Sequence, residues 1–390
     1  MSTALAQRAA HILSLVSPEN PADAVLRQEV GANRELESHE KRALSGAVFA
    51  YYRWLRWLDE SRALPQRVLA ALDLQRRFDS DPAAIKPEAV LARTLPDWAL
   101  AAIDFPSPEA RLACLRQLQR PPSLWIRPQR EFAASVVRAL RHASPATLPA
   151  GFAFPPHALP VTAARYTGPS DLFKSEEFKK GLFEIQDLGS QLVGHACAPL
   201  PTETWWDACC GEGGKTLHLS DLMNNKGLIW ASDRHTGRLA NMRKRAARAQ
   251  AFNFRQVTWN GGPFLPTKTK FDGILVDAPC SGVGTWQRNP HARWTLTEQD
   301  VKELADIQLQ LLENTHKALK PGGRLVFAVC TITRAETTDI VKAFSAAHPE
   351  LEPLALPGLP ANAGLPTGSF LWPHELDANG MFVAAWRKKN

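Results

Sequence analysis

The chain has 390 residues, of which 45% are hydrophobic, and a formal net charge of +7. This length suits roughly two or three domains with sizeable cores rather than one. No run approaches the roughly 18 uninterrupted apolar residues of a membrane span, which excludes an integral membrane protein of the helical class.

Charge and targeting signals narrow the protein class further. The N-terminus lacks the basic-then-apolar pattern of a secretory signal, so we expect a cytoplasmic protein without membrane contacts. The surplus of Lys and Arg lies in residues 121–390, and this is compatible with a polyanionic partner. The six cysteines form no C-x-x-C pair and no His/Cys metal spacing, so we expect reduced thiols and no bound metal.

Residues 1–120 are rich in Ala, Leu and Arg, and their apolar residues recur with helical spacing. The pattern predicts an all-α bundle. Charge alone favours a solvated face for Arg53, Arg56 and Arg62 at least as much as a phosphate-binding stripe. Two apolar stripes define the predicted buried faces: Leu5, Ala9, Ile12, Leu13 and Val16, then Leu44, Val48, Tyr51, Leu55 and Leu58.

A second region, residues 121–186, begins at a Pro-Pro pair. It mixes short apolar runs with one helix-like run and a proline-rich loop, which predicts a small α+β module. The expected strands cover 124–127, 161–166 and 182–185, and the expected helix covers 131–141.

From residue 187 to residue 390 the pattern becomes βαβ. This alternation predicts a mostly parallel sheet covered by helices on both faces. We expect a Pro/Gly-rich loop over 351–373 and a terminal strand over 381–386. The other expected strands lie near 204–208, 227–232, 254–259, 272–277 and 324–330, and the expected helices near 188–198, 216–223, 235–250 and 297–319.

A glycine-rich turn at 209–215 joins the first of these strands to a helix, which places bare backbone N–H groups beside a ligand. A phosphate-binding P-loop would need glycine where Cys209 stands. A dinucleotide fingerprint would need a third glycine at Thr216. An S-adenosylmethionine (SAM) turn needs only the tight glycine pair and a carboxylate after the next strand, and Asp233 stands there.

Two later motifs favour the SAM interpretation. The expected strand 272–277 ends in Asp277-Ala278-Pro279-Cys280, and the strand 324–330 ends at Cys330. With Gln186–Gln191, the glycine turn and Glu336, these motifs resemble the Sun/Fmu (RsmB-like) family of RNA cytosine-5 methyltransferases. The resemblance implies a multidomain protein: a NusB-like RNA-binding domain over 1–120, a small α+β linker module over 121–186, and a Rossmann-like class I SAM methyltransferase domain over 187–390.

The resemblance also implies the reaction and its residues. Cys330 matches the nucleophile that adds to carbon 6 of cytosine, Cys280 the cysteine that assists release, and Asp277 a carboxylate near the base. The expected substrate is small-subunit (16S) ribosomal RNA, modified to 5-methylcytosine in an rRNA-processing step, and the expected state is a monomer. The residues implied for SAM binding are Cys209, Cys210, Gly211, Glu212, Gly213, Gly214, Lys215, Asp233, Asn260 and Asp277.

Departures from the family pattern leave alternatives open. Glu212 brings a negative charge to the turn, and Asn260 replaces an expected aspartate, although its amide oxygen can still accept a hydrogen bond. One alternative is an RNA-binding assembly factor that has lost catalysis. Another is a SAM amino-methyltransferase, which would carry Asn/Asp-Pro-Pro-Tyr/Phe at 277–280, and the weakest is a P-loop ATPase.

Overall fold

The computed structural model describes residues 3–33, 35–154, 160–361 and 364–390. They form two compact units: unit 1 contains Met1–Pro122 and Val283–Glu298, and unit 2 contains Ser123–Gly282 and Gln299–Asn390. The segment 283–298 lies within the range predicted for the methyltransferase domain but packs with unit 1. None of the helices in the described ranges is both long enough and apolar enough to cross a membrane.

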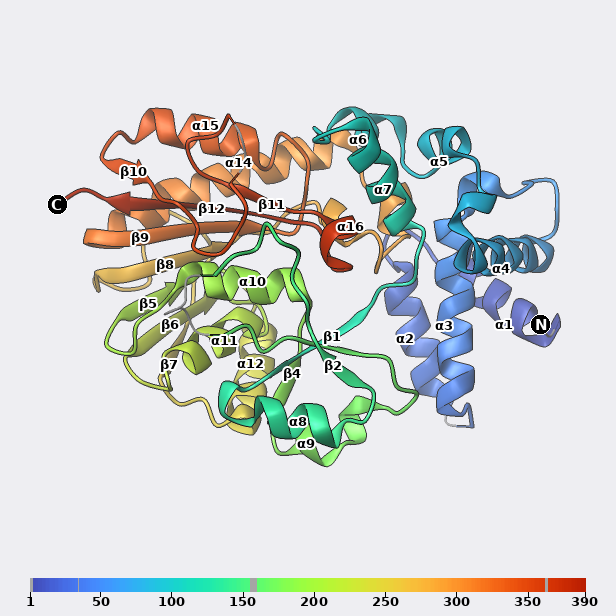
Figure 1. Ribbon diagram of the computed structural model, residues 1–390, viewed down its shortest axis with the longest axis horizontal. Helices are drawn as coiled ribbons and strands as arrows, with labels where there is room; N and C mark the ends of the chain where they lie inside the picture. Colours follow the sequence, from blue (N-terminus) through green and yellow to red (C-terminus); the bar gives the residue numbers. More distant parts are fainter. Residues whose placement is uncertain (1–2, 34, 155–159, 362–363) are drawn as a thin grey trace. The chain divides into compact units, whose positions relative to one another are not determined.

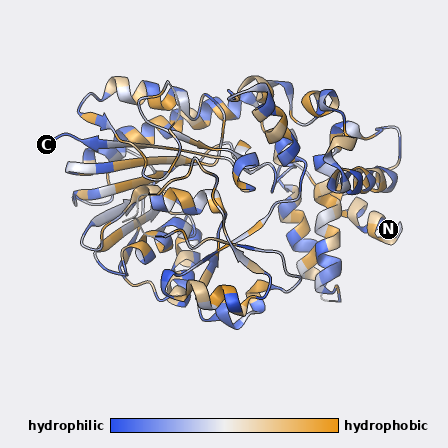
Figure 2. Ribbon diagram, viewed as in Figure 1, coloured by the Kyte–Doolittle hydropathy of each residue, from blue (hydrophilic) through white to orange (hydrophobic). Residues whose placement is uncertain are grey.

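Unit 1 is helical, as the apolar spacing of residues 1–120 predicts. Its helices α1, α3 and α4 pack on one another, and they bury Ala9, Ile12, Leu44 and Val48 from the two predicted stripes. Figure 2 shows hydrophilic and hydrophobic residues side by side along these helices, which is the amphipathic pattern of a bundle. The elements are α1 (Thr3–Ser14), α2 (Ala22–Ala32), α3 (Ser38–Arg53), η1 (Leu55–Trp57), α4 (Leu64–Ser80), η2 (Pro82–Ala84), α5 (Pro87–Arg93), α6 (Asp97–Ala101), α7 (Pro108–Leu118), η5 (Val283–Thr285) and α13 (Ala292–Thr295).

The placement of Arg53 corrects one expectation. Its side chain is only 3% exposed, and its Nη1 donates to Oε1 of Gln75 at 2.8 Å. Arg53 therefore belongs neither to a solvated face nor to a phosphate-binding stripe, whereas Arg56 and Arg62 are exposed.

The segment 283–298 is held in unit 1 by a buried arginine. Arg293 is fully buried, and its guanidinium donates to Oε1 of Gln119 at 2.7 Å and to the carbonyls of Leu118 and Trp286. Nearby, the indole N–H of Trp294 donates to the carbonyl of Tyr52 at 2.7 Å. These contacts anchor a loop that leaves unit 2 only two residues after Cys280.

Unit 2 is built on a mainly parallel sheet in the order β10-β12-β9-β8-β5-β6-β7, with β11 beside β12 (Figure 1). Strands β5 to β9 pair in parallel, and β12 runs antiparallel beside β9. The chain runs outward from β5 to β6 and β7, then returns to place β8 on the other side of β5, so the order reverses between β5 and β8. The strands are β5 (Thr204–Asp207), β6 (Leu228–Asp233), β7 (Phe254–Thr258), β8 (Phe271–Asp277), β9 (Leu319–Val329), β10 (Leu351–Pro353), β11 (Ser369–Leu371) and β12 (Met381–Lys388).

Helices cover both faces of this sheet, as predicted. Trp205 packs in the core under α10 and α11, while its neighbour Trp206 points to the opposite face and contacts Trp259, with ring centroids 4.9 Å apart. Phe344 of α15 contacts Trp386 of β12 at 5.0 Å, beside the core residue Ala385 that faces α10. The helices are α10 (Leu188–Cys197), α11 (Gly214–Leu222), α12 (Thr236–Ala249), α14 (Glu298–Thr315), η6 (His316–Ala318), α15 (Thr338–Ala347) and α16 (Pro373–Leu376).

Two expectations in this region need correction. The stretch 351–373 is not entirely loop, because it contains β10 and β11, which complete the edge of the sheet through β12. The strand expected near 324–330 begins earlier, at Leu319, and residues 320–323 lie inside β9, where the pairing with β8 shifts register and Gly322 adopts a φ of +73°. A glycine in this left-handed region lets the strand bulge without ending.

The module predicted for 121–186 forms a second, antiparallel sheet of order β2-β3-β1-β4. It belongs to unit 2, and Gln129 connects it to the rest of that unit by donating to the carbonyl of Ala249 at 3.0 Å. Its elements are β1 (Leu124–Pro128), η3 (Arg130–Phe132), α8 (Ala133–Ala139), β2 (Ala143–Pro145), β3 (Ala164–Tyr166), η4 (Leu172–Lys174), α9 (Glu176–Lys179) and β4 (Phe183–Ile185).

Candidate active site

The glycine turn between β5 and α11 contains two glycines with different structural roles. Gly211 and Gly213 have φ of +55° and +84°, a region that favours glycine. A Cβ on Gly213 would lie 2.4 Å from Cγ of Met242, so this position packs tightly against α12. A Cβ on Gly211 would meet nothing within 4 Å, so the backbone there faces open space.

That open space is a pocket of about 350 Å³ at the carboxyl ends of β5, β6 and β8. It lies where the strand order reverses, which is where open α/β sheets bind ligands. The predicted cofactor residues Gly213, Gly214 and Lys215 are not part of its lining. The lining residues are Ala208, Cys209, Cys210, Gly211, Glu212, Asp233, Arg234, Arg238, Trp259, Asn260, Gly261, Asp277, Ala278, Pro279, Ile307 and Leu311.

Asp233 and Asn260 both use side-chain oxygens to shape the pocket wall. Asp233 is 7% exposed, and its carboxylate accepts hydrogen bonds from the backbone N–H groups of Gly211 at 3.1 Å and His235 at 2.7 Å. Oδ1 of Asn260 accepts from the N–H of Gly262 at 3.0 Å. A carbonyl oxygen has two lone pairs, so Asn260 keeps an accepting position and its NH₂ for a ligand.

Asp277 pairs with Lys215 across the end of the sheet. Nζ of Lys215 lies 2.7 Å from Oδ2 of Asp277, and the lysine is 9% exposed. Burial alone would lower the pKa of Lys215, but the charge and hydrogen bond of Asp277 and negative charge at Cys330 outweigh it and raise that pKa. Lys215 therefore stays protonated where it favours a thiolate at Cys330.

The two motif cysteines meet beside this ion pair. Cys280 follows β8 and Cys330 follows the neighbouring parallel strand β9, and their sulfur atoms lie 3.3 Å apart. Both are reduced thiols, since a disulfide bond between them would need about 2.05 Å. The hydrogen bond to Cys330, together with burial, raises the pKa of Cys280 well above its ordinary value. Cys280 thus keeps its proton and can donate it to a Cys330 thiolate.

The buried carboxylate of Glu336 accepts hydrogen bonds from both loops that carry the cysteines. Glu336 is 0% exposed, and Oε1 accepts from the N–H of Ser281 at 2.8 Å and from Gln308 at 3.0 Å. Oε2 accepts from the hydroxyls of Ser281, Thr331 and Thr333 at 2.5, 2.9 and 2.7 Å. Because Ser281 follows Cys280 and Thr331 follows Cys330, this one carboxylate holds the two thiols close to each other.

Asp207, at the end of β5, is a further buried acid that sequence reasoning did not place in the site. Its Oδ2 accepts from the hydroxyl of Thr216 at 2.6 Å, which ties the strand to the first turn of α11. Burial raises the pKa of Asp207 to about 7.

Sequence reasoning also gave no role to the Lys215–Asp277 pair or to Glu336. The signal available for Glu336 was a lone acid in a stretch rich in hydroxyls, with Thr331, Thr333, Thr337 and Thr338 around it. A carboxylate accepts several hydrogen bonds at once, so an acid with many hydroxyl groups nearby can be buried with its oxygens hydrogen-bonded.

Comparison with known proteins agrees with this geometry. A family model described as 16S rRNA methyltransferase RsmB/F matches residues 195–387. A curated relative from Bacillus subtilis, named probable ribosomal RNA small subunit methyltransferase B, is 36% identical over 223 residues, which are 54% of this chain and 49% of the relative. The chain spans about half the length of the first curated relatives that it matches.

Solved structures give the same result. A methyltransferase homolog protein from Pyrococcus horikoshii superposes with a TM-score of 0.60 and 27% identity, covering 72% of this chain and 91% of that one. The structure of NSun6 from Pyrococcus horikoshii with SFG gives a TM-score of 0.52 and 27% identity, with 57% of each chain covered. Together with the glycine turn, the Pro-Cys motif and the paired thiols, these matches show that the chain belongs to the RsmB/F family of 16S rRNA methyltransferases.

Proposed function

We propose that this protein is a SAM-dependent methyltransferase that forms 5-methylcytosine in small-subunit ribosomal RNA through a covalent Cys–cytosine intermediate. The observation that carries the proposal is the pair of reduced thiols, 3.3 Å apart at the ends of adjacent parallel strands, beside a ligand pocket. An amino-methyltransferase has no use for two thiols at this position.

The residues of the pocket fit SAM. Asp233 offers a carboxylate to ribose hydroxyls, and Asn260 offers the oxygen and the NH₂ of its side-chain amide to an adenine edge. The apolar part of the pocket wall is formed by Trp259, Ile307 and Leu311. The related NSun6 structure contains SFG, an analogue of SAM. When bound, SAM supplies the methyl group.

The protein's own groups supply the rest of the chemistry. The Cys330 thiolate forms a bond to carbon 6 of cytosine, which moves an electron pair to carbon 5 and makes that carbon nucleophilic. After carbon 5 gains the methyl group, its proton leaves to a base, and the returning electron pair breaks the carbon 6–sulfur bond. Lys215 favours the thiolate at the start, and Cys280 can protonate the departing Cys330 sulfur at the end. The target base must leave its stack to reach these thiols.

We further propose that the helical region 1–120 is NusB-like and adds RNA affinity rather than chemistry. Support comes from the resemblance of residues 1–120 to a NusB-like domain and from exposed arginines on α4, Arg76 and Arg77. Deleting this region is a poor test, because residues 283–298 pack with it and Arg293 would be uncovered. Single charge substitutions in the full-length chain are cleaner.

The test of the reaction compares two cysteine variants with 16S rRNA fragments and SAM. Cys330→Ala should abolish methylation and leave no covalent adduct. Cys280→Ala should still transfer the methyl group but release slowly, so an RNA-linked band that survives denaturing electrophoresis should accumulate, and the double variant should lose it.

Two other outcomes would contradict the proposal. An adduct that persists in Cys330→Ala and vanishes in Cys280→Ala would reverse the roles of the thiols. RNA binding with neither methylation nor adduct in the unsubstituted protein would favour an assembly factor instead.

A further inference from the structure

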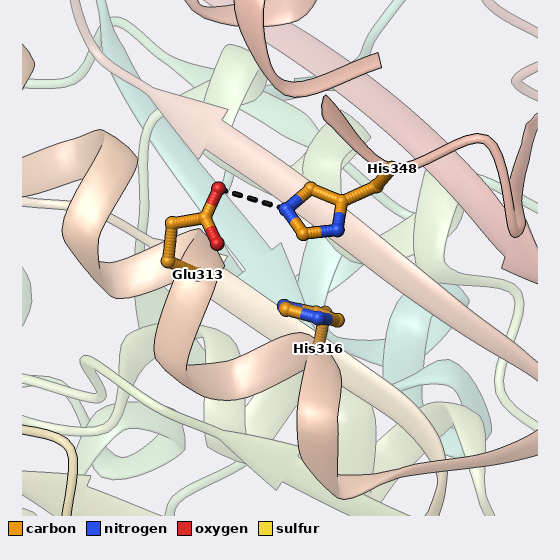
Figure 3. Close-up of side chains that lie close together, drawn as sticks. All are labelled: Glu313, His316 and His348. Atoms are coloured by element: carbon orange, nitrogen blue, oxygen red, sulfur yellow. Dashed lines mark hydrogen bonds and ion pairs between the residues drawn. The ribbon is translucent and has the colours of Figure 1, made fainter. Parts of the chain in front are cut away.

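Outside the active site, three side chains with metal-ligating atoms converge on one face of unit 2 (Figure 3). Glu313 lies in the last turn of α14, His316 begins η6 three residues later, and His348 follows the end of α15. One ligand atom from each lies within 4.8 Å of the other two. None of the three residues lines the pocket beside the glycine turn.

The hydrogen bonds of both histidines leave Nε2 facing the centre of this cluster. Nδ1 of His316 lies 3.1 Å from the carbonyl oxygen of Leu312, which can only accept, so Nδ1 carries the hydrogen and Nε2 keeps its lone pair. Nδ1 of His348 lies 3.0 Å from a carboxylate oxygen of Glu350, while its Nε2 lies 2.8 Å from Oε1 of Glu313. Metal-bound histidines commonly have this arrangement, with the second nitrogen held by a carbonyl or a carboxylate.

We propose that Glu313, His316 and His348 form a binding site for a zinc-class divalent cation, with Glu350 orienting His348. Two imidazole nitrogens and one carboxylate suit Zn²⁺, whereas Mg²⁺ and Ca²⁺ prefer oxygen ligands alone. Ligand atoms about 2.1 Å from a tetrahedral zinc lie about 3.4 Å from one another. The distances between the three ligand atoms therefore have to shorten by roughly 1.5 Å or less when zinc binds. Glu313 is partly exposed (37%) at the end of its helix and can make that movement, and a water would complete the coordination.

The site joins two helices that support the active site. Gln308, on α14, donates to the carbonyl of Pro279 and to Glu336, and α15 begins two residues after Glu336. A cation bound by Glu313, His316 and His348 would tie the far end of α15 to α14. Phe344 already packs against both imidazoles there, with ring centroids 5.9 Å from His316 and 4.6 Å from His348. The role is therefore structural: the cation stabilises the frame that holds the cysteine loops.

Without a cation, the same side chains make a hydrogen-bonded network in which His348 bridges two carboxylates. Two measurements on the full-length chain, stripped with a chelator, separate the possibilities. Calorimetry with Zn²⁺ should show about one site, and X-ray absorption should show only nitrogen and oxygen neighbours at about 2.0–2.1 Å. A sulfur shell at about 2.3 Å would place the zinc on cysteines and overturn the assignment.

Variants complete the test. Glu313→Gln keeps the size of a partly exposed side chain and should weaken zinc binding at least tenfold, as should His316→Ala; Glu350→Gln should weaken it by about tenfold. His11→Ala, at an exposed histidine of unit 1, is the matched control and should leave affinity unchanged. Zinc should raise the melting temperature of Glu313→Gln less than that of the unsubstituted protein. Equal zinc affinity in Glu313→Gln and the unsubstituted protein, or no zinc binding in either, would show a hydrogen-bonded network only.

Discussion

Replacing Glu336 with alanine is the sharpest test of how the two thiols are held together. Its carboxylate accepts five hydrogen bonds from residues of three segments, so the substitution removes the acceptor that these segments share. We expect the protein to lose both stability and methyl-transfer activity, while SAM binding changes little because Glu336 does not line the pocket.

The loss of stability depends on which of the hydrogen-bond donors to Glu336 find another acceptor in the variant. The hydroxyls of Ser281 and Thr331 are 2.9 Å apart and can bond to each other, and Gln308 retains the carbonyl of Pro279 at 3.0 Å. The N–H of Ser281 has only the carboxylate, and an orphaned buried donor costs about 1–3 kcal/mol. With weaker hydroxyl bonds and a small cavity added, Glu336→Ala should lower the free energy of unfolding by about 3 kcal/mol.

Glu336→Gln is the matched control. Its amide oxygen can still accept from Ser281, and its NH₂ can donate to hydroxyls that reverse their direction, so we expect a loss of only about 1 kcal/mol. Urea unfolding measures the stability, and the rate of alkylation of Cys280 and Cys330 reports their environment. In Glu336→Ala the two thiols should react more nearly independently, and methyl transfer should fall more than RNA affinity.

A role for Glu336 in holding the thiols is refuted if the free energy of unfolding of Glu336→Ala lies within about 0.5 kcal/mol of that of the unsubstituted protein and the variant methylates RNA at the same rate. That result would mean that the loops hold the cysteines without the carboxylate.

Three further predictions follow from the same structure. Asp233→Ala should weaken SAM binding by roughly 10–100-fold in calorimetry, since it removes a charged acceptor from the pocket wall, and unchanged affinity would contradict the cofactor assignment. Asp207, with its pKa raised to about 7 by burial, holds a proton in the folded state that the unfolded chain releases near pH 4, so its contribution to stability is lost as pH rises between these values. Asp207→Asn should therefore gain stability relative to the unsubstituted protein from about pH 5 to about pH 8 in urea unfolding, and a constant difference would disprove the raised pKa. Arg77→Gln should weaken RNA binding and reduce the slope of log affinity against log salt by about one, whereas an unchanged slope would remove α4 from the RNA interface.

From β5 to β9, the sequence alone determined the alternation of strands and helices in unit 2 and the location of its ligand-binding edge. These follow from local signals: the period of apolar residues, glycines at positions of positive φ, and motifs that end adjacent strands. Because the carboxyl ends of parallel strands share one edge of a sheet, the positions of Cys280 and Cys330 in the chain are enough to predict that both lie near Asp277.

The contacts that hold the side chains of this site in position could be seen only in the tertiary structure. The five hydrogen bonds of Glu336, the reach of Lys215 to Asp277, and the burial of Arg53 depend on how helices are rotated and where loops run, which local periodicity does not encode. The packing of 283–298 into unit 1 likewise joins segments more than a hundred residues apart in the chain. Glu313 and His348 are also distant in sequence, so their meeting reflects the packing of two helices on one sheet and leaves no recognisable spacing in the sequence.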